Sequence, residues 1–592
     1  MRLPMYFGPQ ADTRFYDGGL PMLNGVFCQQ VIRANRGYSE FSREPGFTYN
    51  HAPMLCRYRG YFYLLYLTSP VHEHGGFACA MLTRSESGLS WSVPKVAFPD
   101  LPVPGGVYCG PDADAVRAEE RTVVHHRMAF YLAKNGVLLV MTHHGVSPKP
   151  HSGPNTGYGM GRTVRRIFPD GTLGDIFVLR VNTEAGWKME HFPYPWFEES
   201  GDAAFAEACR DVIADRAANA AWWEEERLNT GFFPLTGIKA PSLVTLPDGN
   251  LMAIGKNGLC SVSGDGGESW TKPKVAEGII TSGGKCLSVR TGDGRYAILY
   301  NPSADGQHRW PLAAITSDDG YEYRNMACVS GDVAPMRYGG YLKNFGLNYI
   351  RGIMPGNDDA PDRYTWVTFS MNKEDIWIAR LSESLTSDVK EDVDDDFSKM
   401  SSAIPNEWNI YSLLWSPVRV TDGALEIRTG EPADCARASR NFPVSERVRL
   451  EIEIVLESAE NGRLRMEATD RKGMPIVRLA LEADGSIRFR AGNGEWPVGT
   501  WENGVIMRFT LELDALAQRV CLFVNGVETR RDPMMCPATE AARLTIRTGD
   551  TLPGYTVDDN LKNVCFADLP ATEERHSEAV YRILSFRATR RK

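Results

Sequence analysis

Short apolar runs separated by turn-forming residues recur along the first two thirds of the chain. Three clear runs are 61–66 (YFYLLY), 137–141 (VLLVM) and 296–300 (YAILY), and Gly, Pro, Asn and Asp are frequent between such runs. Apolar runs of this length, bounded by these residues, are typical of β-strands. The pattern predicts an all-β fold up to about residue 385.

One segment departs from this pattern. Residues 202–227 are rich in Ala, carry Glu and Arg, and contain neither Gly nor Pro. This composition predicts a helix. We therefore expect a helical insertion over about 198–228, packed outside the sheets.

Beyond residue 400 the apolar positions alternate with charged ones. The segments 449–454 (RLEIEI), 508–514 (RFTLELD) and 520–526 (VCLFVNG) show this period of two. One apolar and one charged face predict a two-sheet β-sandwich over 401–592, which resembles the jelly-roll sandwiches of laminin-G and concanavalin type. The acidic stretch 386–400 is interpreted as a solvated linker, and the sandwich is expected to be separable unless its interface is large and apolar.

A repeated turn motif specifies the architecture of the first part. Residues 263–270 read SGDGGESW, which fits the Asp-box pattern S-x-D-x-G-x-x-W, and weaker copies occupy 83–91 and 316–323. The paired glycines supply the positive φ that a tight hairpin needs. Three copies, each after an apolar run, predict a β-propeller of repeated four-stranded blades over 1–385. The box is structural and places no catalytic residue.

Composition and charge exclude several classes of partner. The net charge of −9 gives no basic footprint, so we expect no nucleic-acid partner. No apolar run approaches the roughly 20 residues of a membrane span, so no membrane partner is expected. The 12 cysteines are scattered without CxxC pairs, and no signal peptide is visible after Met1. These features favour a cytoplasmic protein, although a secreted chain trimmed of its signal would look the same.

Histidines are concentrated near the N-terminus. Eight of the eleven precede residue 152: His51, His72, His74, His125, His126, His143, His144 and His151. Because loop ends of adjacent blades meet at a propeller axis, these side chains are candidates for one site. His51 lies just before the strand 54–58, and His72 follows the next strand. The spacings match no compact zinc signature, so we expect neither a metal nor another cofactor.

A second constellation lies in the Gly-rich segment 157–166 (GYGMGRTVRR). Its glycines allow close approach of the backbone to a ligand. Tyr158, Arg162 and Arg165 are of the residue types that bind sugar acids, because a guanidinium group grips a carboxylate with two hydrogen bonds. The alternative is a Gly-rich blade edge with solvated arginines.

Several segments resemble a group of carbohydrate-active seven-bladed propellers. The matching pieces are 49–53 (YNHAP), 161–167 with 170–177, 349–353 (YIRGI) and 369–377 (FSMNKEDIW). The group contains rhamnosyl-glucuronate-cleaving enzymes, named both as α-L-rhamnosidases and as L-rhamnose-α-1,4-D-glucuronate lyases, and it is related to the propeller ulvan lyases. The resemblance covers residues 1 to about 385 and implies a uronate-containing oligosaccharide or polysaccharide as substrate.

The resemblance also implies roles for individual residues. His51 occupies the place of an essential early histidine, and His72 that of a second histidine in the lyase members. The Tyr and Arg that these members take from the next blade have no close match at the corresponding place in this sequence. The expected catalytic residues are His51, His72, Tyr158 and His143, and the expected substrate-binding residues are Arg162, Arg165, His126 and Arg127.

Three functions remain open at this stage. A uronate lyase needs a group that neutralises the carboxylate, a base and an acid, which His, Tyr and Arg can provide. A typical glycosidase needs two carboxylates, and Glu73 is one candidate. A sialidase-type hydrolase needs an arginine triad with a Tyr/Glu pair, and Arg2-Leu3-Pro4 is only a faint echo of its early motif. The lyase is favoured, with hydrolysis and pure glycan binding as alternatives.

Overall fold

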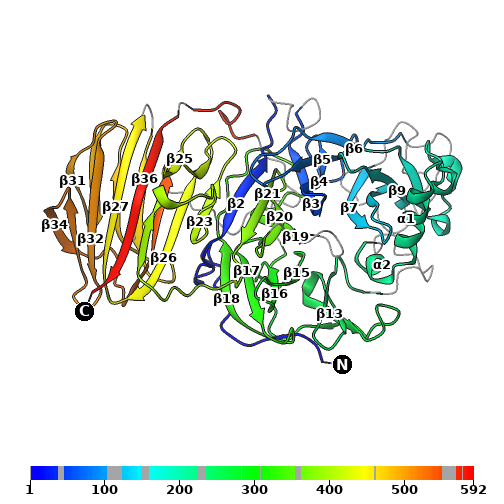
Figure 1. Cartoon of the computed structure of the whole chain (residues 1–592), viewed down its shortest axis with the longest axis horizontal. Coiled ribbons are helices and arrows are strands. Elements are labelled where there is room, and N and C mark those ends of the chain that lie inside the picture. The colour runs from blue at the N-terminus through cyan, green and yellow to red at the C-terminus, as the bar shows by residue number, and fades with distance from the viewer. Residues whose placement is uncertain are drawn as a thin grey trace.

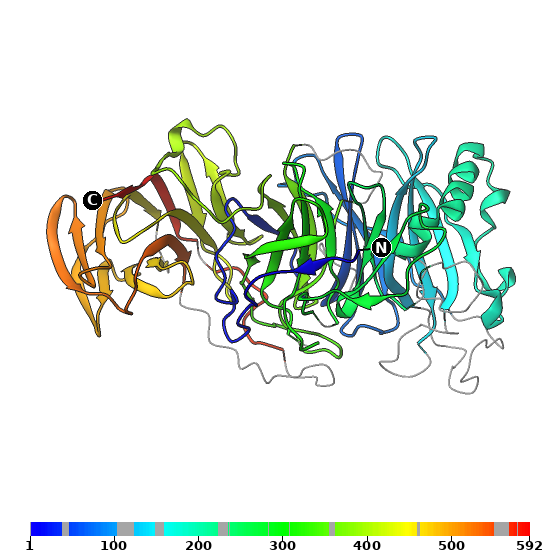
Figure 2. The same cartoon turned by 90° about the horizontal axis from the view of Figure 1, so that it is seen from below.

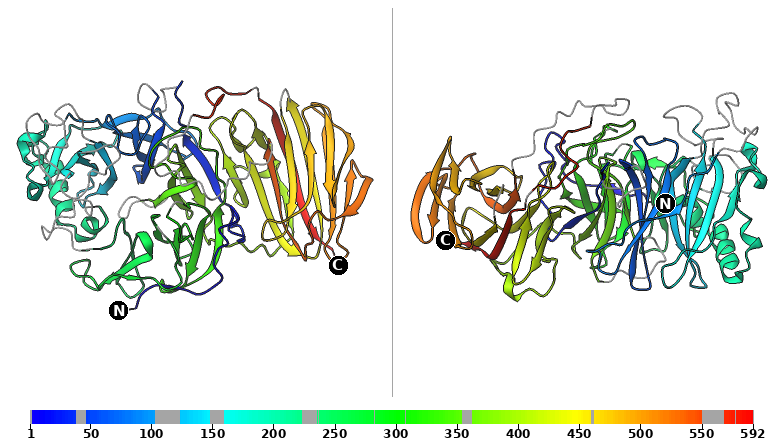
Figure 3. Two further views of the ribbon diagram at one scale, coloured as in Figure 1. Left: turned by 180° about the vertical axis from the view of Figure 1, so that it is seen from behind. Right: turned by 90° about the horizontal axis from the view of Figure 1, so that it is seen from above.

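A computed structural model describes residues 2–37, 46–102, 123–147, 159–222, 235, 237–281, 283–306, 308–353, 362–458, 462–549, 568–576 and 578–591. Most of the described elements are strands. Blade-like sheets and a sandwich lie side by side (Figure 1). Figures 2 and 3 show the sandwich at one end of the molecule and the two α-helices at the other. Among the described residues, no helix has the length and apolar character needed to cross a membrane.

The N-terminal part consists of five sets of four strands. The first is β3 (Tyr49–Tyr58), β4 (Tyr61–Ser69), β5 (Cys79–Ser85) and β6 (Lys95–Phe98). The second is β7 (Val123–Leu132), β8 (Leu138–Gly145), β9 (Gly159–Ile167) and β10 (Phe177–Val181). The third is β11 (Ser242–Thr245), β12 (Leu251–Ile254), β13 (Leu259–Ser263) and β14 (Lys274–Val275). The fourth is β15 (Leu287–Arg290), β16 (Tyr296–Tyr300), β17 (Leu312–Ser317) and β18 (Glu322–Ser330), with β1 (Met5–Tyr6) added to its edge.

The fifth set joins the two ends of the propeller. It contains β19 (Leu347–Gly352), β20 (Thr365–Met371), β21 (Asp375–Leu381) and the N-terminal strand β2 (Phe27–Ile32). The first four sets are separate sheets, and the fifth is the end of an eleven-stranded sheet. The propeller prediction is therefore confirmed, but the described residues form five blade-like sets where seven blades were expected.

The described α-helices lie in the insertion that the sequence predicted to be helical. The α-helices are α1 (Ala203–Ala214) and α2 (Arg216–Trp222), within the range predicted to be helical. The short 3₁₀ helices are η3 (Thr183–Ala185), η4 (Met189–His191), η5 (Phe197–Glu199), η7 (Lys256–Gly258) and η8 (Phe397–Lys399). Helix α2 contacts both β7 and β11, so the insertion lies at the seam between the second and third blades.

The direction of the strands defines two faces of the propeller. The first strands of neighbouring blades contact each other, as β3 does β7 and β19, and β15 does β11 and β19, so they lie nearest the axis. Starts of first strands and ends of second strands lie on one face, because neighbouring strands are antiparallel. We call this the His51 face, since His51 lies at the start of β3. The opposite face holds the turns that follow the third strands, and we call it the Asp-box face.

All three Asp-box turns share one hydrogen bond. The hydroxyl groups of Ser85, Ser263 and Ser317 accept from the backbone N–H of Gly88, Gly267 and Gly320, at 2.9, 2.8 and 2.9 Å. In the first two turns an indole N–H also donates to that glycine's carbonyl oxygen. Each turn joins the third and fourth strands of a blade. The motif thus closes hairpins, as its sequence predicted.

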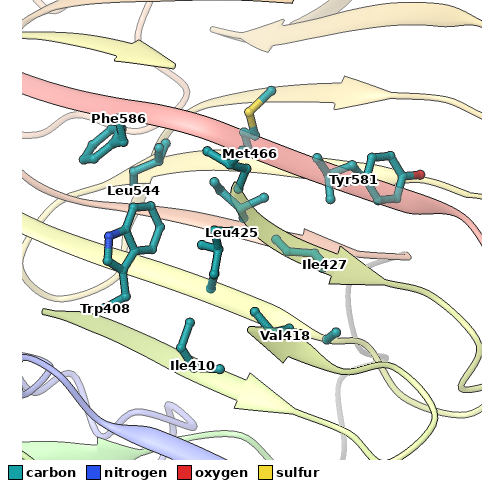
Figure 4. Packing of buried hydrophobic residues seen from close by; sticks show 14 of the residues in the cluster. Trp408, Ile410, Val418, Leu425, Ile427, Met466, Leu544, Tyr581 and Phe586 are labelled. Carbon is teal, nitrogen blue, oxygen red and sulfur yellow. The ribbon is translucent and has the colours of Figure 1, made fainter. Parts of the chain in front are cut away.

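The C-terminal part consists of two facing sheets. One contains β23 (Trp408–Ser412), β26 (Arg437–Ser445), β35 (Ala541–Thr548), β28 (Leu464–Thr469), β29 (Pro475–Leu481), β30 (Ser486–Ala491) and β31 (Gly494–Thr500). The other contains β24 (Val418–Thr421), β25 (Ala424–Arg428), β36 (Val580–Arg590), β27 (Arg447–Ser458), β32 (Ile506–Asp514), β33 (Arg519–Val524) and β34 (Val527–Pro533). Figure 4 shows Trp408, Leu425, Met466 and Phe586 packed between these layers.

The acidic stretch 386–400 is not a solvated linker throughout. Its residues Val393–Asp396 form β22, which pairs with β36 of the sandwich. Asp395 accepts hydrogen bonds from the Trp408 indole at 2.9 Å and from Arg440 at 2.8 Å. The acidic side chains do not prevent this pairing, because strands pair through their backbone groups. A run of acids can therefore form a strand where a neighbouring strand is available.

The sandwich and the propeller share a sheet and a core. Strand β2 pairs antiparallel with β21 and parallel with β23, so one sheet runs from the last blade into the sandwich. One cluster of buried residues includes Phe27, Leu64 and Trp366 together with the sandwich core. The interface is therefore continuous and apolar, which is the condition under which the sandwich was not expected to be separable.

Candidate functional site

Two β-bulges bring an imidazole and a phenol together on the His51 face. The pairing of β3 with β4 shifts between His51 and Met54, and that of β19 with β20 shifts between Asn348 and Arg351. Tyr349, within the second bulge, has φ of +57°. Such conformations are costly for residues other than glycine and cluster at functional sites. The rings of His51 and Tyr349 lie 4.4 Å apart, centroid to centroid.

Lysines from two other blades surround the Tyr349 phenol. Lys256, just after β12, donates a hydrogen bond to the phenol oxygen at 2.5 Å. The ammonium group of Lys285, just before β15, lies 4.6 Å from the centre of the Tyr349 ring. Four blades thus contribute to one cluster, and the lysine ammonium groups favour negative charge on the phenol oxygen.

The charge around Tyr349 makes its phenol unusually acidic. Burial opposes ionisation of this phenol, but the positive charge of Lys256 above all, with Lys373 and Arg309, outweighs it and lowers the pKa to about 8. The net effect is opposite at Tyr49 and Tyr300, whose pKa burial raises. Perturbed titration of this kind marks candidates for catalysis.

His51 is held as a neutral base. Its side chain is completely buried, and burial above all, then the charge of Lys373, lowers its pKa well below the ordinary value. Its Nδ1 shares a hydrogen bond of 2.7 Å with the hydroxyl oxygen of Ser370 on β20. Which of these atoms carries the proton depends on the tautomer, but the bond fixes the orientation of the ring.

A buried ion pair lies beside these groups. Lys373 donates to the carboxylate of Glu73 at 2.8 Å, and both side chains are less than one tenth exposed. Burial opposes ionisation of Glu73, yet Lys373 and then His74 hold its pKa below its usual range. Glu73 is therefore an acceptor at neutral pH rather than a proton donor.

The structure places the predicted residues in several different surroundings. His72 is next to Glu73 in sequence, and its Nδ1 accepts a hydrogen bond of 2.9 Å from the backbone N–H of Tyr341. His143 and Arg162 lie opposite each other on β8 and β9, at the same face but in the second blade. Arg162 donates at 3.1 Å to the carbonyl oxygen of Arg127, so these two predicted substrate-binding residues contact each other.

Arg165 lies away from the candidate site. Its guanidinium group donates to the carbonyl oxygens of Gly174 and Ala97, each at 2.7 Å, and so ties the second blade to the first. The predicted residue Tyr158 lies outside the described residues, and so does the side chain of His126. In the described part of the chain, no group of three or more His, Cys, Asp or Glu side chains is placed to hold a metal ion.

Sequence reasoning missed most of the cluster around Tyr349. It did not select Tyr349, Lys256, Lys285, Arg309 or Lys373. A signal was present, because Tyr349 and Lys373 lie in two of the segments that carried the family resemblance. The lysines lie singly at strand ends of separate blades, and nothing in their spacing shows that they meet at the axis.

A cavity lies toward the Asp-box face of the described structure. Its volume is about 740 Å³, and its lining includes Tyr131, Asp215, Arg351 and Trp366. Arg351 donates to the carbonyl oxygens of Cys286 and Ala240 at 3.3 and 3.2 Å. Among the lining residues, Tyr131 and Arg351 lie at the ends of the first strands β7 and β19. The cavity therefore lies toward the face opposite the Tyr349 cluster.

Comparisons with known proteins support the architecture. A family model described as BT_1020-like, N-terminal beta propeller, matches residues 4–238, and one described as Sialidase-like, CBM domain, matches residues 408–561. No curated protein matches the chain. These matches show a β-propeller followed by a sialidase-like CBM domain.

One solved structure is similar over the whole chain. It is named "Sialidase", is 33% identical, and has a TM-score of 0.94, with 100% of this chain and 54% of that chain covered. This chain thus spans about half the length of that protein. Trypanosoma rangeli sialidase in complex with 2,3-difluorosialic acid is also similar, at 11% identity and a TM-score of 0.36 over 96% of each chain. The family models and the structure named "Sialidase" thus make this chain similar to sialidase-like propeller proteins, and the narrower resemblance to rhamnosyl-glucuronate-cleaving enzymes stays a prediction.

Proposed function

We propose that this protein cleaves a glycosidic bond next to a sugar carboxylate, with Tyr349 as the reacting group. The observation that carries the proposal is the buried Tyr349 phenol, whose oxygen accepts a hydrogen bond from Lys256 and whose pKa is lowered to about 8. A phenol with this pKa is partly ionised at neutral pH, whereas an ordinary tyrosine is not. The likeness to a sialidase supports the same proposal.

The charges of the cluster suit an anionic sugar. Glu73 neutralises Lys373, while Lys256, Lys285 and Arg309 add three further positive charges near the phenol. A carboxylate bound beside these cations offsets the cost of burying them. The substrate class is therefore a glycan with a sugar acid at the bond that is cleaved.

Hydrolysis by displacement is the reaction we favour. The Tyr349 oxygen attacks the anomeric carbon, the glycosidic C–O bond breaks, and the leaving oxygen takes up a proton. Water then cleaves the sugar from the tyrosine, which regains its hydrogen bond with Lys256. A tyrosine nucleophile is the known departure of sialidases from the two-carboxylate rule. It also explains why no pair of free carboxylic acids is needed at this centre.

Elimination at a uronic acid is the second candidate. The contact between neutral His51 and Tyr349, at 4.4 Å, favours it, because a base and an acid then lie side by side. The base removes the proton at C5 of the uronate, the C4–O bond breaks, and the leaving oxygen takes a proton. The finer form of this candidate is release of L-rhamnose from rhamnosyl-glucuronate caps.

One product analysis tests the proposal and separates the two reactions. The protein is incubated with fluorogenic glycosides of a sialic acid and of glucuronic acid, and with a rhamnosyl-glucuronate-capped glycan. Displacement gives a saturated acid that incorporates oxygen from labelled water, and elimination gives an unsaturated uronate that absorbs in the ultraviolet. Cleavage of a neutral glycoside alone would contradict the proposal. Binding of the acidic glycans without cleavage would show a glycan-binding protein instead.

A further inference from the structure

The turn between β20 and β21 connects the groups of the candidate site. We call residues 372–375 the keystone turn, and its Asn372 and Lys373 have φ of +55° and +56°. Lys373 pairs with Glu73, and its carbonyl oxygen accepts from the N–H of Asn50, the residue before His51, at 3.0 Å. One short turn thus touches two of the strand ends at which the site is built.

The same turn is tied to the segment that carries Tyr349. The side chain of Asn372 accepts from the backbone N–H of Gly346 at 2.8 Å and donates to the carbonyl oxygen of Ala334 at 2.7 Å. The N–H of Asn372 also donates to the carbonyl oxygen of Gly346, at 2.9 Å. A shift of the turn would therefore be transmitted toward β19, where Tyr349 lies three residues beyond Gly346.

The other half of the keystone turn consists of two buried acids. Glu374 accepts from the backbone N–H groups of Arg337 and Tyr338 at 3.0 and 2.8 Å, and from Lys343 at 3.0 Å. Asp375 accepts from the Arg337 guanidinium group at 2.5 Å. Buried carboxylates are stable only when such partners are in place, so these contacts determine where the turn sits.

The sandwich reaches these acids through β2. The backbone N–H of Leu414, just after β23, donates to the side-chain oxygen of Gln30 at 3.0 Å. The amide nitrogen of Gln30 in turn donates to Asp375 at 2.8 Å. A single side chain thus links the sandwich to the keystone turn.

A bidentate ion pair forms a second link. Glu431 of the sandwich accepts two hydrogen bonds of 2.7 Å from the guanidinium group of Arg33, and both side chains are almost fully buried. The next residue, Ala34, donates its N–H to Asp375 at 2.8 Å. A third link runs from Glu573, which accepts from the Tyr338 hydroxyl at 2.8 Å.

We propose that the sandwich is a working part of the candidate active site, because Gln30 and the Arg33–Glu431 pair fix the keystone turn and the turn in turn fixes His51, Glu73 and Tyr349. Gln30, Arg33 and Glu431 are positioning residues that touch no substrate. The inference rests on the proposed function for the identity of the reacting groups. It goes beyond that function in assigning the sandwich a role other than sugar binding.

The test follows the ionisation of Tyr349, which needs no substrate. Phenolate absorbance is titrated from pH 6 to pH 10 in the whole protein, and the curve of Tyr349→Phe is subtracted. In Gln30→Leu and Glu431→Gln we expect the midpoint to rise by roughly one unit, the lower end of what a displaced neighbouring charge contributes. Gln30→Asn, which keeps an amide but shortens its reach, serves if Gln30→Leu does not fold.

A matched control breaks another ion pair between the same two domains. Arg437 of β26 pairs with Asp332, which follows β18, and neither residue contacts the keystone turn. Arg437→Gln is expected to lower the melting temperature and to leave the titration midpoint unchanged. Unchanged midpoints in the folded Gln30 and Glu431 variants, or an equal rise in the control, would overturn the proposal.

Turnover gives a separate readout. With any substrate that the wild type cleaves, we expect kcat of Gln30→Leu to fall roughly tenfold to a hundredfold, the cost of a displaced catalytic group, while KM changes little. If the wild type cleaves nothing, the proposed function fails, but the titration still decides whether the sandwich controls Tyr349. A fall in thermal stability with unchanged kcat and midpoint would reduce the links to a purely structural role.

Discussion

The two ends of the propeller differ in what they offer a ligand. The Asp-box face has a cavity of about 740 Å³, but two of the polar side chains that line it are engaged by the protein: Asp215 accepts from Tyr131 at 3.2 Å, and Arg351 donates to backbone carbonyls. The His51 face is closely packed, yet it holds an acidified phenol, a neutral imidazole and several cations. The two faces thus differ in the charge and burial of their side chains, and perturbed groups like those of the His51 face mark candidates for catalysis.

Removal of the Tyr349 hydroxyl should cause the largest loss of activity, and it tests whether the His51 face is the reactive one. We expect Tyr349→Phe to lower kcat/KM on an acidic glycoside by about 10²–10⁴-fold, the usual worth of a group that moves protons or bonds in the transition state. The matched change at the other end, Tyr131→Phe, removes only the hydroxyl that donates to Asp215, so the rate should change little. Steady-state kinetics of the two variants, with melting curves to check folding, measure this difference. Equal losses in both variants would contradict the assignment of the reaction to the His51 face.

Loss of the His51 ring should have the next largest effect. His51→Ala removes the side chain that packs against Tyr349 and bonds to Ser370, and we expect a loss of about a hundredfold in kcat. Because the ring is fully buried, His51→Gln is the better-folded companion variant, and circular dichroism checks both. Full activity of either folded variant on every glycan cleaved by the wild type would remove His51 from the site.

A pH profile of the rate tests whether the charges at the His51 face control the ionisation of Tyr349. If the Tyr349 phenolate is the active form, the rate of the wild type should rise with pH through about 8. Lys256→Met removes the largest charge that lowers this pKa, so the rise should move to higher pH. Each unit of that shift costs roughly tenfold in rate at pH 7, where less phenolate is present. A profile that does not move would show that Lys256 does not control the reacting group.

The last prediction concerns stability rather than activity, at a carboxyl group that lies at neither face of the propeller. Asp434 accepts from the Tyr411 hydroxyl at 2.7 Å near the junction of the domains, and burial raises its pKa to about 7. A carboxyl with a raised folded-state pKa binds more protons when folded, so its contribution to stability decreases as pH rises from about 4 to 7. Asp434→Asn should therefore leave the free energy of unfolding nearly unchanged at pH 4 and raise it at pH 8 by up to about 4 kcal/mol, because each unit of pKa displacement is worth about 1.4 kcal/mol. Urea titrations at both pH values measure this difference.

Local signals in the sequence predicted the hairpins but not their number. The Asp-box residues Ser263, Gly267 and Trp270 carry their own hydrogen bonds, so the turn is encoded within eight residues. The number of blades depends on how strands group around an axis, which no local pattern contains. The acidic run 394–396 was misleading for a similar reason, because its strand forms only against β36, nearly two hundred residues later.

The candidate site was predicted in part. His51 was selected from its position at a strand start, and it lies in the cluster. Tyr349 was not selected, because its inward position depends on a bulge and a positive φ that sequence periodicity does not reveal. Arg165 was selected for its chemistry, but its guanidinium group satisfies backbone carbonyls between two blades. Whether each of these residues belongs to the cluster depends on contacts between distant segments of the chain, which residue type alone does not reveal.

The double pairing of β2 has a consequence for how the chain is made. Phe27 pairs with Arg380 on one side and with Ile410 on the other. At about 5–20 residues per second, synthesis reaches the second partner strand roughly 20 to 80 seconds after β2 has been translated. During that interval both edges of an apolar strand lack their final neighbours, a condition that invites wrong pairing. We therefore expect substitutions in β2 to affect the yield of soluble protein more than the stability of molecules that have already folded.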